Sequence, residues 1–372
     1  MMRRIIILCL MAVSLTTLAQ TPKVIPLSDE AYQASEEYQA GNKYQKDAIL
    51  FMDMVADTHP YFIYPERRAE WFAQKPALLE RCKDIDTDSD FADALADILG
   101  PLRDGHTNIA MAHHPGSQQT DEAHDQPGPI DPDHIMRWHS GYYDYRIFAD
   151  KGICYLQFNR CNDISGQPFA SFLDEMFDQM RREKIKTLVV DVQYNPGGNS
   201  QLCVRLLQHL HPAERLKGFT TYIRLSNLLV ATYPQFAETK NQWESQGHQD
   251  ELYPASRSDV PANKLRLNIF DGNVIFVMGP RTYSSAGMLL TMARDNHIGT
   301  IIGTGSSFPP SHYGEILSYR LPNTGIQGTI SCKLFARPDA ATIDDPCLHP
   351  DHEIDLKDKD AAWQYIVERN SM

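Results

Sequence analysis

The sequence lacks an excess of basic residues. Its 372 residues include 35 Lys and Arg against 48 Asp and Glu, which gives a formal net charge of −13 at pH 7. An acidic chain is repelled by the phosphates of nucleic acids and by the headgroups of anionic membranes. We therefore expect neither nucleic acid nor an anionic membrane surface as a partner.

Cysteines in metal-type or redox-type pairs are also absent. No cysteine belongs to a CxxC pair or stands near histidines at a zinc-type spacing, and the histidines between positions 113 and 139 are irregularly spaced. We expect no metal and no cofactor. After the first 19 residues the cysteines stand at positions 82, 154, 161, 203, 332 and 347. An oxidising compartment would permit disulfides, but several of these cysteines lie in apolar strands, where buried thiols are more common.

The third absence is a long hydrophobic run near the start. The apolar stretch over residues 5–13 is shorter than the roughly 20 residues that a spanning helix needs. It follows Arg3 and Arg4 and precedes small residues that end at Ala19, which is typical of a signal peptide over residues 1–19. The residues before Cys9 are not the small ones of a lipoprotein site. We expect an exported protein, periplasmic or secreted, without integral membrane association or a lipid anchor.

The remaining chain divides by pattern into three parts. Residues 20–112 are expected to form an N-terminal helical module, because apolar residues recur every three or four positions over 91–102 and over 48–55. His59 and Pro60 stop the earlier helix. Residues 113–141, rich in proline, glycine and charge, are expected to be a linker or loop. Residues 142–372 are expected to form a catalytic α/β domain.

The α/β assignment of the third part depends on continuous apolar strands. Residues 153–158, 187–192, 274–278 and 299–302 are strand-like, and amphipathic helices separate them. Such strands indicate a parallel sheet covered by helices. Residues 211–266 show no clear period and are interpreted as an insertion near the substrate side. No internal repeat is present.

Three segments carry residues that could perform chemistry. Ser284 stands where a buried strand turns into a helix, so its hydroxyl would lie beside unpaired N–H groups, although a serine there is commonly only an N-cap. Gly197 and Gly198 follow another strand and could form an oxyanion hole or an ordinary tight turn. His106 could accept a proton, or it could be a turn residue.

Together these segments resemble the tail-specific, or C-terminal processing, serine peptidase family. Residues 284–286 resemble its nucleophile turn, 191–198 its Asp-x-x-x-Asn-x-Gly-Gly segment, and 104–107 its histidine motif. Two short signatures, Leu-Pro-Asn-Thr-Gly at 321–325 and Leu-His-Pro-Asp at 348–351, follow in the same order. The resemblance spans roughly residues 45–365 and implies a crotonase/ClpP-like fold.

The branch of the family follows from two further absences. No lysine occurs over residues 303–313, where a serine–lysine dyad would need one. No room exists for a PDZ module between His106 and the first strand of the sheet, because such a module takes on the order of a hundred residues. The chain therefore resembles the tricorn-core and retinoid-binding-protein-like branch, in which a histidine serves as the base.

The resemblance implies a role for each site residue. Ser284 attacks a peptide carbonyl, His106 accepts its proton, and the turn of Gly197 and Gly198 holds the oxyanion together with the amide of Ser285. The acid that orients the histidine would be Asp344 or Asp345, with Glu315 as a second possibility. Two positions depart from the family pattern: Gly287 replaces a glutamate, and Gln193 replaces an arginine.

These observations favour an exported serine peptidase that acts on peptide or protein substrates with exposed ends or loose folds. One alternative is a non-catalytic protein that binds a peptide or an apolar ligand on the same fold, which Gly287 and Gln193 favour. Another is an esterase with the same nucleophile chemistry. The sequence predicts no oligomeric state.

Overall fold

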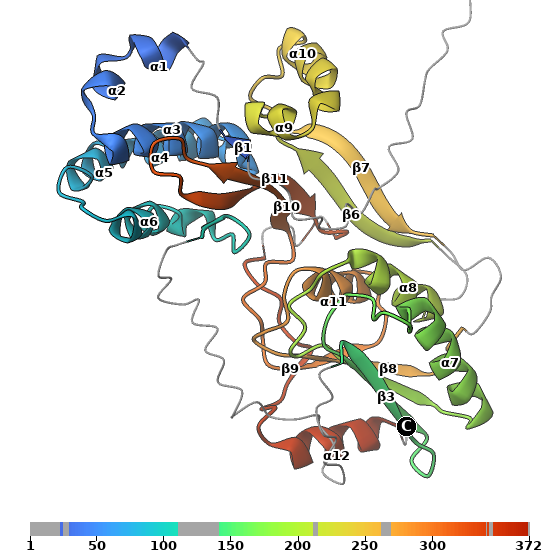
Figure 1. Ribbon diagram of the computed structural model, residues 1–372. Helices are drawn as coiled ribbons and strands as arrows, with labels where there is room; N and C mark the ends of the chain where they lie inside the picture. Colours follow the sequence, from blue (N-terminus) through green and yellow to red (C-terminus); the bar gives the residue numbers. More distant parts are fainter. Residues whose placement is uncertain are drawn as a thin grey trace, which may run out of the picture.

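The computed structural model describes residues 23–24, 30–110, 141–210, 215–261, 269–339, 341 and 345–370. The expected signal peptide, nearly all of the expected linker, and Asp344 lie outside these residues. The described chain forms two lobes, one above the other in Figure 1.

The lower lobe is built on a mixed sheet with strand order β12-β9-β8-β5-β4-β3, in which only the β3–β4 pair is antiparallel. Its strands are β3 (Tyr143–Phe148), β4 (Ile153–Phe158), β5 (Thr187–Asp191), β8 (Asn273–Met278), β9 (Thr300–Gly303) and β12 (His352–Glu353). Its helices are α7 (Phe169–Arg182), α8 (Ser200–Leu210), α11 (Ser285–Asp295) and α12 (Lys359–Asn370).

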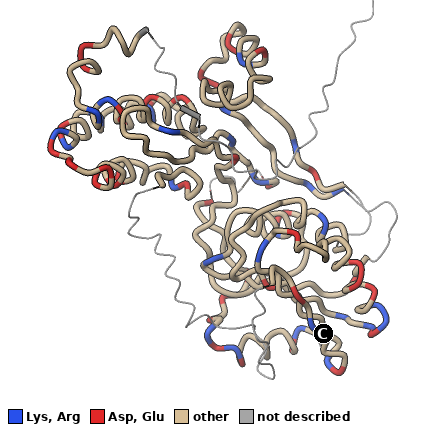
Figure 2. Tube along the Cα trace, viewed as in Figure 1, with Lys and Arg blue, Asp and Glu red and all other residues tan. Residues whose placement is uncertain are grey.

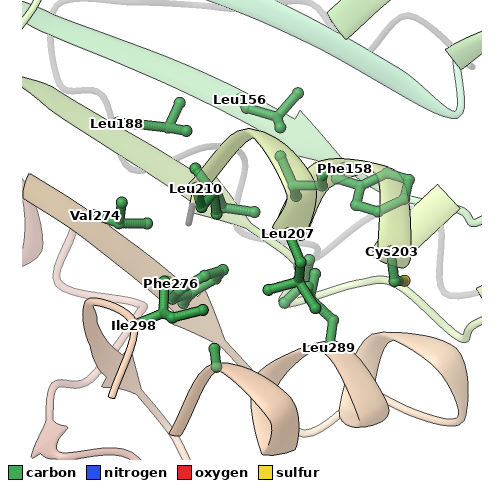
Figure 3. Close-up of a cluster of buried hydrophobic side chains, with 14 of the residues drawn as sticks. Leu156, Phe158, Leu188, Cys203, Leu207, Leu210, Val274, Phe276, Leu289 and Ile298 are labelled. Carbon is green, nitrogen blue, oxygen red and sulfur yellow. The ribbon is translucent and has the colours of Figure 1, made fainter. Parts of the chain in front are cut away.

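Helices cover both faces of this sheet, as continuous apolar strands require. On one face, leucines of α8 and α11 such as Leu207 and Leu289 pack over Leu188 and Phe276 (Figure 3). On the other face, α12 contributes Trp363 and Ile366. The described cysteines are all free, and only Cys347 among them is not buried.

The upper lobe begins with the expected helical module. Its elements are α1 (Glu30–Ala34), α2 (Glu36–Ala40), α3 (Lys43–Thr58), η1 (Pro60–Ile63), α4 (Pro65–Ala73), α5 (Lys75–Arg81), α6 (Asp88–Asp97) and η2 (Gly100–Leu102). Asn42 and Gln45 form a capping box at the start of α3. His59 closes the helix, and its N–H donates to Val55 O. The α/β fold class with an N-terminal helical module is thus confirmed.

A second, largely antiparallel sheet completes the upper lobe. Its order is β1-β10-β11-β6-β7, with β2 paired to β11. The strands are β1 (Lys23–Val24), β2 (Asn108–Ile109), β6 (Leu216–Ile223), β7 (Tyr253–Val260), β10 (His312–Arg320) and β11 (Gln327–Ala336). The connection from β6 to β7 carries α9 (Asn227–Thr232), η3 (Pro234–Phe236) and α10 (Ala237–Ser245).

This upper sheet combines strands from the segment after residue 142 with strands of the N-terminal part of the chain. Residues 142–372 do not build one sheet: β6, β7, β10 and β11 pair with one another, and Leu317 and Ile330 share a hydrophobic core with the helices of the N-terminal module. The segment 211–266, interpreted as an insertion, supplies the β6–β7 pair. Charged residues of both signs occur in both lobes (Figure 2). Among the described residues, no helix has the length and apolarity to cross a membrane.

Candidate active site

Ser284 lies at the turn from β8 into α11, in a strained backbone conformation. Its φ of 49° and ψ of −123° are rare for a residue with a side chain, and its hydroxyl makes no capping hydrogen bond to the helix. Backbone strain of this kind costs roughly 1–3 kcal/mol and is concentrated at functional sites. The geometry therefore differs from that of an ordinary N-cap serine.

The Gly197–Gly198 turn lies against Ser284 because β5 and β8 are adjacent parallel strands that end at the same edge of the sheet. Gly197 has a φ of 101°, and a Cβ atom on it would lie 2.6 Å from the Cβ of Ser284. Only glycine permits this approach. The backbone N–H of Tyr283 donates to Asn195 O at 3.0 Å and ties the two turns together.

The three amides expected at the oxyanion hole differ in their partners. The N–H of Gly197 donates to the side-chain oxygen of Asn195 at 2.8 Å, so it is already occupied. Within the described part of the chain, the amides of Gly198 and Ser285 have no hydrogen-bond acceptor. The Ser285 hydroxyl donates to Gly198 O at 2.6 Å and fixes one turn to the other. Two free N–H groups therefore flank the nucleophile turn.

His106 reaches this site from the upper lobe. Its Nε2 lies 3.4 Å from the Oγ of Ser284, and its Nδ1 lies 3.3 Å from Oδ1 of Asp104. Because a carboxylate only accepts hydrogen bonds, the proton belongs on Nδ1, which leaves the lone pair of Nε2 facing the serine. Pairing of β2 with β11 and the hydrogen bond from Thr329 Oγ1 to His106 O hold the loop in place.

Asp104 is a buried carboxylate, with only 2% of its side chain exposed. Burial alone would raise the pKa of Asp104, but hydrogen bonds from His106 and His59 outweigh it and hold the pKa below its ordinary value. The Thr107 hydroxyl also donates to it, at 2.7 Å. Asp104 therefore stays ionised beside His106.

The carboxylates that the sequence proposed for this role lie elsewhere. Asp345 accepts from Nη1 of Arg337 at 2.7 Å, and Glu315 pairs with Lys333 at 3.3 Å. Asp344 lies outside the described residues. The acid that the structure places on His106 is Asp104, because the short 104–107 turn brings it there within the histidine motif itself.

The two departures from the family pattern are accommodated by packing. A Cβ on Gly287 would lie 2.2 Å from the ring of Phe308, so that ring occupies the space beside α11 where a side chain would stand. Gln193 donates from its backbone N–H and its side-chain amide to Asp191, at 3.0 and 2.8 Å, and Tyr155 donates at 2.5 Å. Burial raises the pKa of Asp191, and these hydrogen bonds oppose the rise only in part.

The two remaining signatures are structural. In the 321–325 turn, Asn323 and Thr324 donate through backbone and side chain to the buried carboxylate of Asp47 on α3. In 348–351, Asp351 accepts from the N–H of Ile301 and from Arg294. These motifs join the helical module to the upper sheet and fix the end of α11.

Comparison with known proteins identifies the family of the chain. The profile of Peptidase family S41 matches residues 152–354, which is more than half of the chain. The chain belongs to peptidase family S41. This family indicates a serine-type peptidase, and protein or peptide as the class of substrate. No curated protein matches the chain.

Solved structures place this S41 chain among similar folds. One is a candidate peptidase from Parabacteroides merdae, with 17% identity and a TM-score of 0.59, covering 87% of this chain and 96% of the other. Another is a photosystem II D1 C-terminal processing protease, with 12% identity and a TM-score of 0.49, covering 88% and 98%. At such identities the first likeness shows the fold alone.

Two neighbours of the S41 site were not assigned by sequence reasoning. Asp104 belongs to the histidine motif, and its place two residues before His106 is a sequence signal that could have indicated the acid. Tyr283 precedes the nucleophile, its ring lies 5.3 Å from that of His106, and burial raises its pKa to about 12. No sequence signal indicated this contact between the lobes.

Proposed function

We propose that this chain is an exported, active serine peptidase in which Ser284 is the nucleophile and His106 the general base. The observation that carries the proposal is the 3.4 Å approach of His106 Nε2 to the hydroxyl of a serine that is strained and does not cap its helix. Catalytic hydrogen bonds are often this long without substrate. Export follows from the N-terminal pattern and predicts a mature chain that begins at Gln20.

In the proposed reaction, Ser284 Oγ attacks the carbonyl carbon of the scissile bond while His106 Nε2 takes its proton. The amides of Gly198 and Ser285 stabilise the oxyanion. The C–N bond then breaks as His106 returns the proton to the leaving amine, and water hydrolyses the acyl-enzyme with His106 again as base. Asp104 holds Nδ1–H and stabilises the imidazolium.

The two departures do not argue for the binding-protein alternative. Phe308 fills the space beside Gly287, and Gln193 supplies Asp191 with hydrogen bonds. Neither residue forms a hydrogen bond to Ser284 or His106 in the described part of the chain. The proposed chemistry therefore requires no group that the packing has removed.

The test is labelling by a fluorophosphonate, with the modified peptide identified by mass spectrometry. We expect labelling of the wild type and complete loss in Ser284→Ala. Ser256→Ala is the matched control, because it removes an exposed serine hydroxyl on β7, and it should still be labelled. Absence of Ser284-dependent labelling in folded protein would favour the binding protein. Labelling with hydrolysis of small esters but of no peptide would favour the esterase.

A further inference from the structure

His59 is a buried histidine that the proposed reaction does not use. It closes helix α3, its side chain is 0% exposed, and its Nε2 lies 3.1 Å from Oδ2 of Asp104. Its ring packs against Tyr313 at a centroid distance of 4.5 Å and against Phe62 at 6.2 Å. A polar ring enclosed this completely needs partners for both nitrogens.

The hydrogen bonds of His59 define its tautomer. Its Nδ1 accepts the backbone N–H of Tyr61 at 3.1 Å, so the proton of the neutral ring is on Nε2. That N–H points at Asp104, which can only accept. The backbone is fixed as well, since His59 N–H donates to Val55 O and His59 O accepts from Phe62. The ring is therefore held in a single orientation.

The two oxygens of Asp104 bind different partners: Oδ1 faces His106, and Oδ2 faces His59 of the helical module. Oδ1 accepts from the backbone N–H of His106 at 3.0 Å and faces its Nδ1. Oδ2 accepts from His59 and from Thr107 Oγ1. The carboxylate cannot rotate without breaking both sets, and donors at Oδ2 draw part of its negative charge away from His106.

We propose that His59 is a positioning residue for the reaction, which holds Asp104 in place and limits its charge, so that the basicity and orientation of His106 are set in part from helix α3. The inference rests on the proposed function, because it acts through His106 on Ser284. It assigns the helical module a part in the chemistry.

Other ionisable groups lie near the contacts between His59, Asp104 and His106. None of them is substituted in the experiment below. Tyr61 in η1 and Tyr313 in β10 flank His59, and Arg67 in α4 is close to Tyr313. His312 in β10 and Tyr283 before α11 lie near Asp104. None of these donates to Oδ2 of Asp104 in a hydrogen bond of the described residues.

The experiment compares His59→Phe with His59→Gln. Both variants lose the acceptor at Nδ1, but glutamine keeps an N–H donor near the position of Nε2. The rate constant of fluorophosphonate labelling is measured from pH 5 to pH 9 in folded protein. We expect His59→Phe to label about tenfold more slowly or worse, as for loss of a hydrogen bond to a charged group. Its acidic limb should move to higher pH, because Asp104 would hold the protonated imidazole more tightly. His59→Gln should stay within about threefold of the wild type.

Two results would overturn the inference: a wild-type rate and pH profile in His59→Phe, or equal impairment in both variants. If His59→Phe does not fold, ¹⁵N-histidine NMR of the wild type decides, because a His59 ring protonated on Nδ1 contradicts the inference and one protonated on Nε2 supports it. If the wild type is not labelled at all, the proposed function fails instead. The two failures are therefore distinguishable.

Discussion

At the scale of single residues, two carboxylates compete for the role of the acid that orients His106. Asp104 lies on Nδ1 and is buried, whereas Asp345 pairs with Arg337 and has 48% of its side chain exposed. We expect Asp104→Asn to slow labelling by about 10²–10⁴-fold, because an amide neither fixes the tautomer nor stabilises the imidazolium. Asp345→Asn should change the rate less than about twofold.

The measurement is the second-order rate of fluorophosphonate labelling in each variant, with Asp344→Asn as a third protein. A slow Asp345→Asn or Asp344→Asn protein beside a normal Asp104→Asn protein would contradict the assignment.

His312 is a second single residue with a measurable effect, here on stability. Burial lowers its pKa to about 3, and nearby His106 acts in the same direction. Its ring stacks on Phe335 at 5.1 Å and lies 4.7 Å from Phe308. Below pH 6.5 the unfolded chain therefore binds a proton at His312, whereas the folded chain does not bind it until about pH 3. The free energy of unfolding falls as the pH falls through this window.

Between pH 7 and pH 5, His312 should account for a loss of about 2 kcal/mol in the free energy of unfolding of the wild type. We expect His312→Phe to lose about 2 kcal/mol less than the wild type over the same range. Urea unfolding of both proteins at the two pH values measures this difference. The same loss in both proteins would show that His312 is not the group that titrates.

At the scale of elements, α11 has the proposed nucleophile at its start and a glycine in its first turn. In an open helix, Gly287→Ala would stabilise by about 1 kcal/mol. Here the new Cβ would lie 2.2 Å from Phe308, and overpacking of this kind costs about 1–3 kcal/mol. We expect the clash to dominate, with a net loss of about 1–2 kcal/mol in the free energy of unfolding.

A double-mutant cycle with Phe308→Ala tests the contact. Gly287→Ala should be neutral or stabilising once the ring is removed, and urea unfolding of the four proteins gives the coupling energy. Additive effects would mean that the ring does not block this position.

The elements also show what the sequence could predict. The strands β4, β5 and β8 are buried on both faces, so their apolar runs were visible without partners. In contrast, β7 is mostly exposed and its residues include Pro254, Ser256 and Arg257. Its strand conformation depends on pairing with β6, and a contact between distant residues leaves little local signal.

The candidate site shows the same difference between residues marked by local pattern and residues brought together by packing. Ser284, Gly197 and Gly198 lie at the ends of adjacent parallel strands, and local pattern marked those ends. The contacts of Asp104 with His59, and of Tyr283 with His106, depend on how α3 and the two lobes pack. Local sequence patterns do not predict how distant elements pack, so these contacts could not be predicted from the sequence.

At the scale of the whole molecule, the site depends on a joint between the lobes at the end of α11. Arg337, beyond β11, forms two hydrogen bonds to Asp295, at 2.5 and 3.1 Å, and both side chains are almost completely buried. Asn296 exchanges two hydrogen bonds with the backbone of Lys217 in β6. The joint links the upper lobe, which carries His106, to the end of the helix that begins after Ser284.

We expect Asp295→Leu alone to lower the free energy of unfolding by about 3–5 kcal/mol, because it removes the buried carboxylate that accepts two hydrogen bonds from the buried guanidinium of Arg337. The double variant Asp295→Leu with Arg337→Met should lose less free energy of unfolding than Asp295→Leu alone. It should also recover the rate of fluorophosphonate labelling that the single variant loses. Urea unfolding and fluorophosphonate labelling measure both effects. A double variant less stable than the single one would argue against the Arg337–Asp295 pair as the joint.

The separation of His106 and Ser284 on different lobes has a consequence for the synthesis of the chain. The histidine, its aspartate and the helical module are made first, whereas the serine follows only after 177 further residues have been added. A partly made chain therefore contains a base without a nucleophile. The strand β11, which pairs with β2 beside His106, is made after Ser284, so the proposed peptidase activity would arise only late in synthesis, when both lobes are complete.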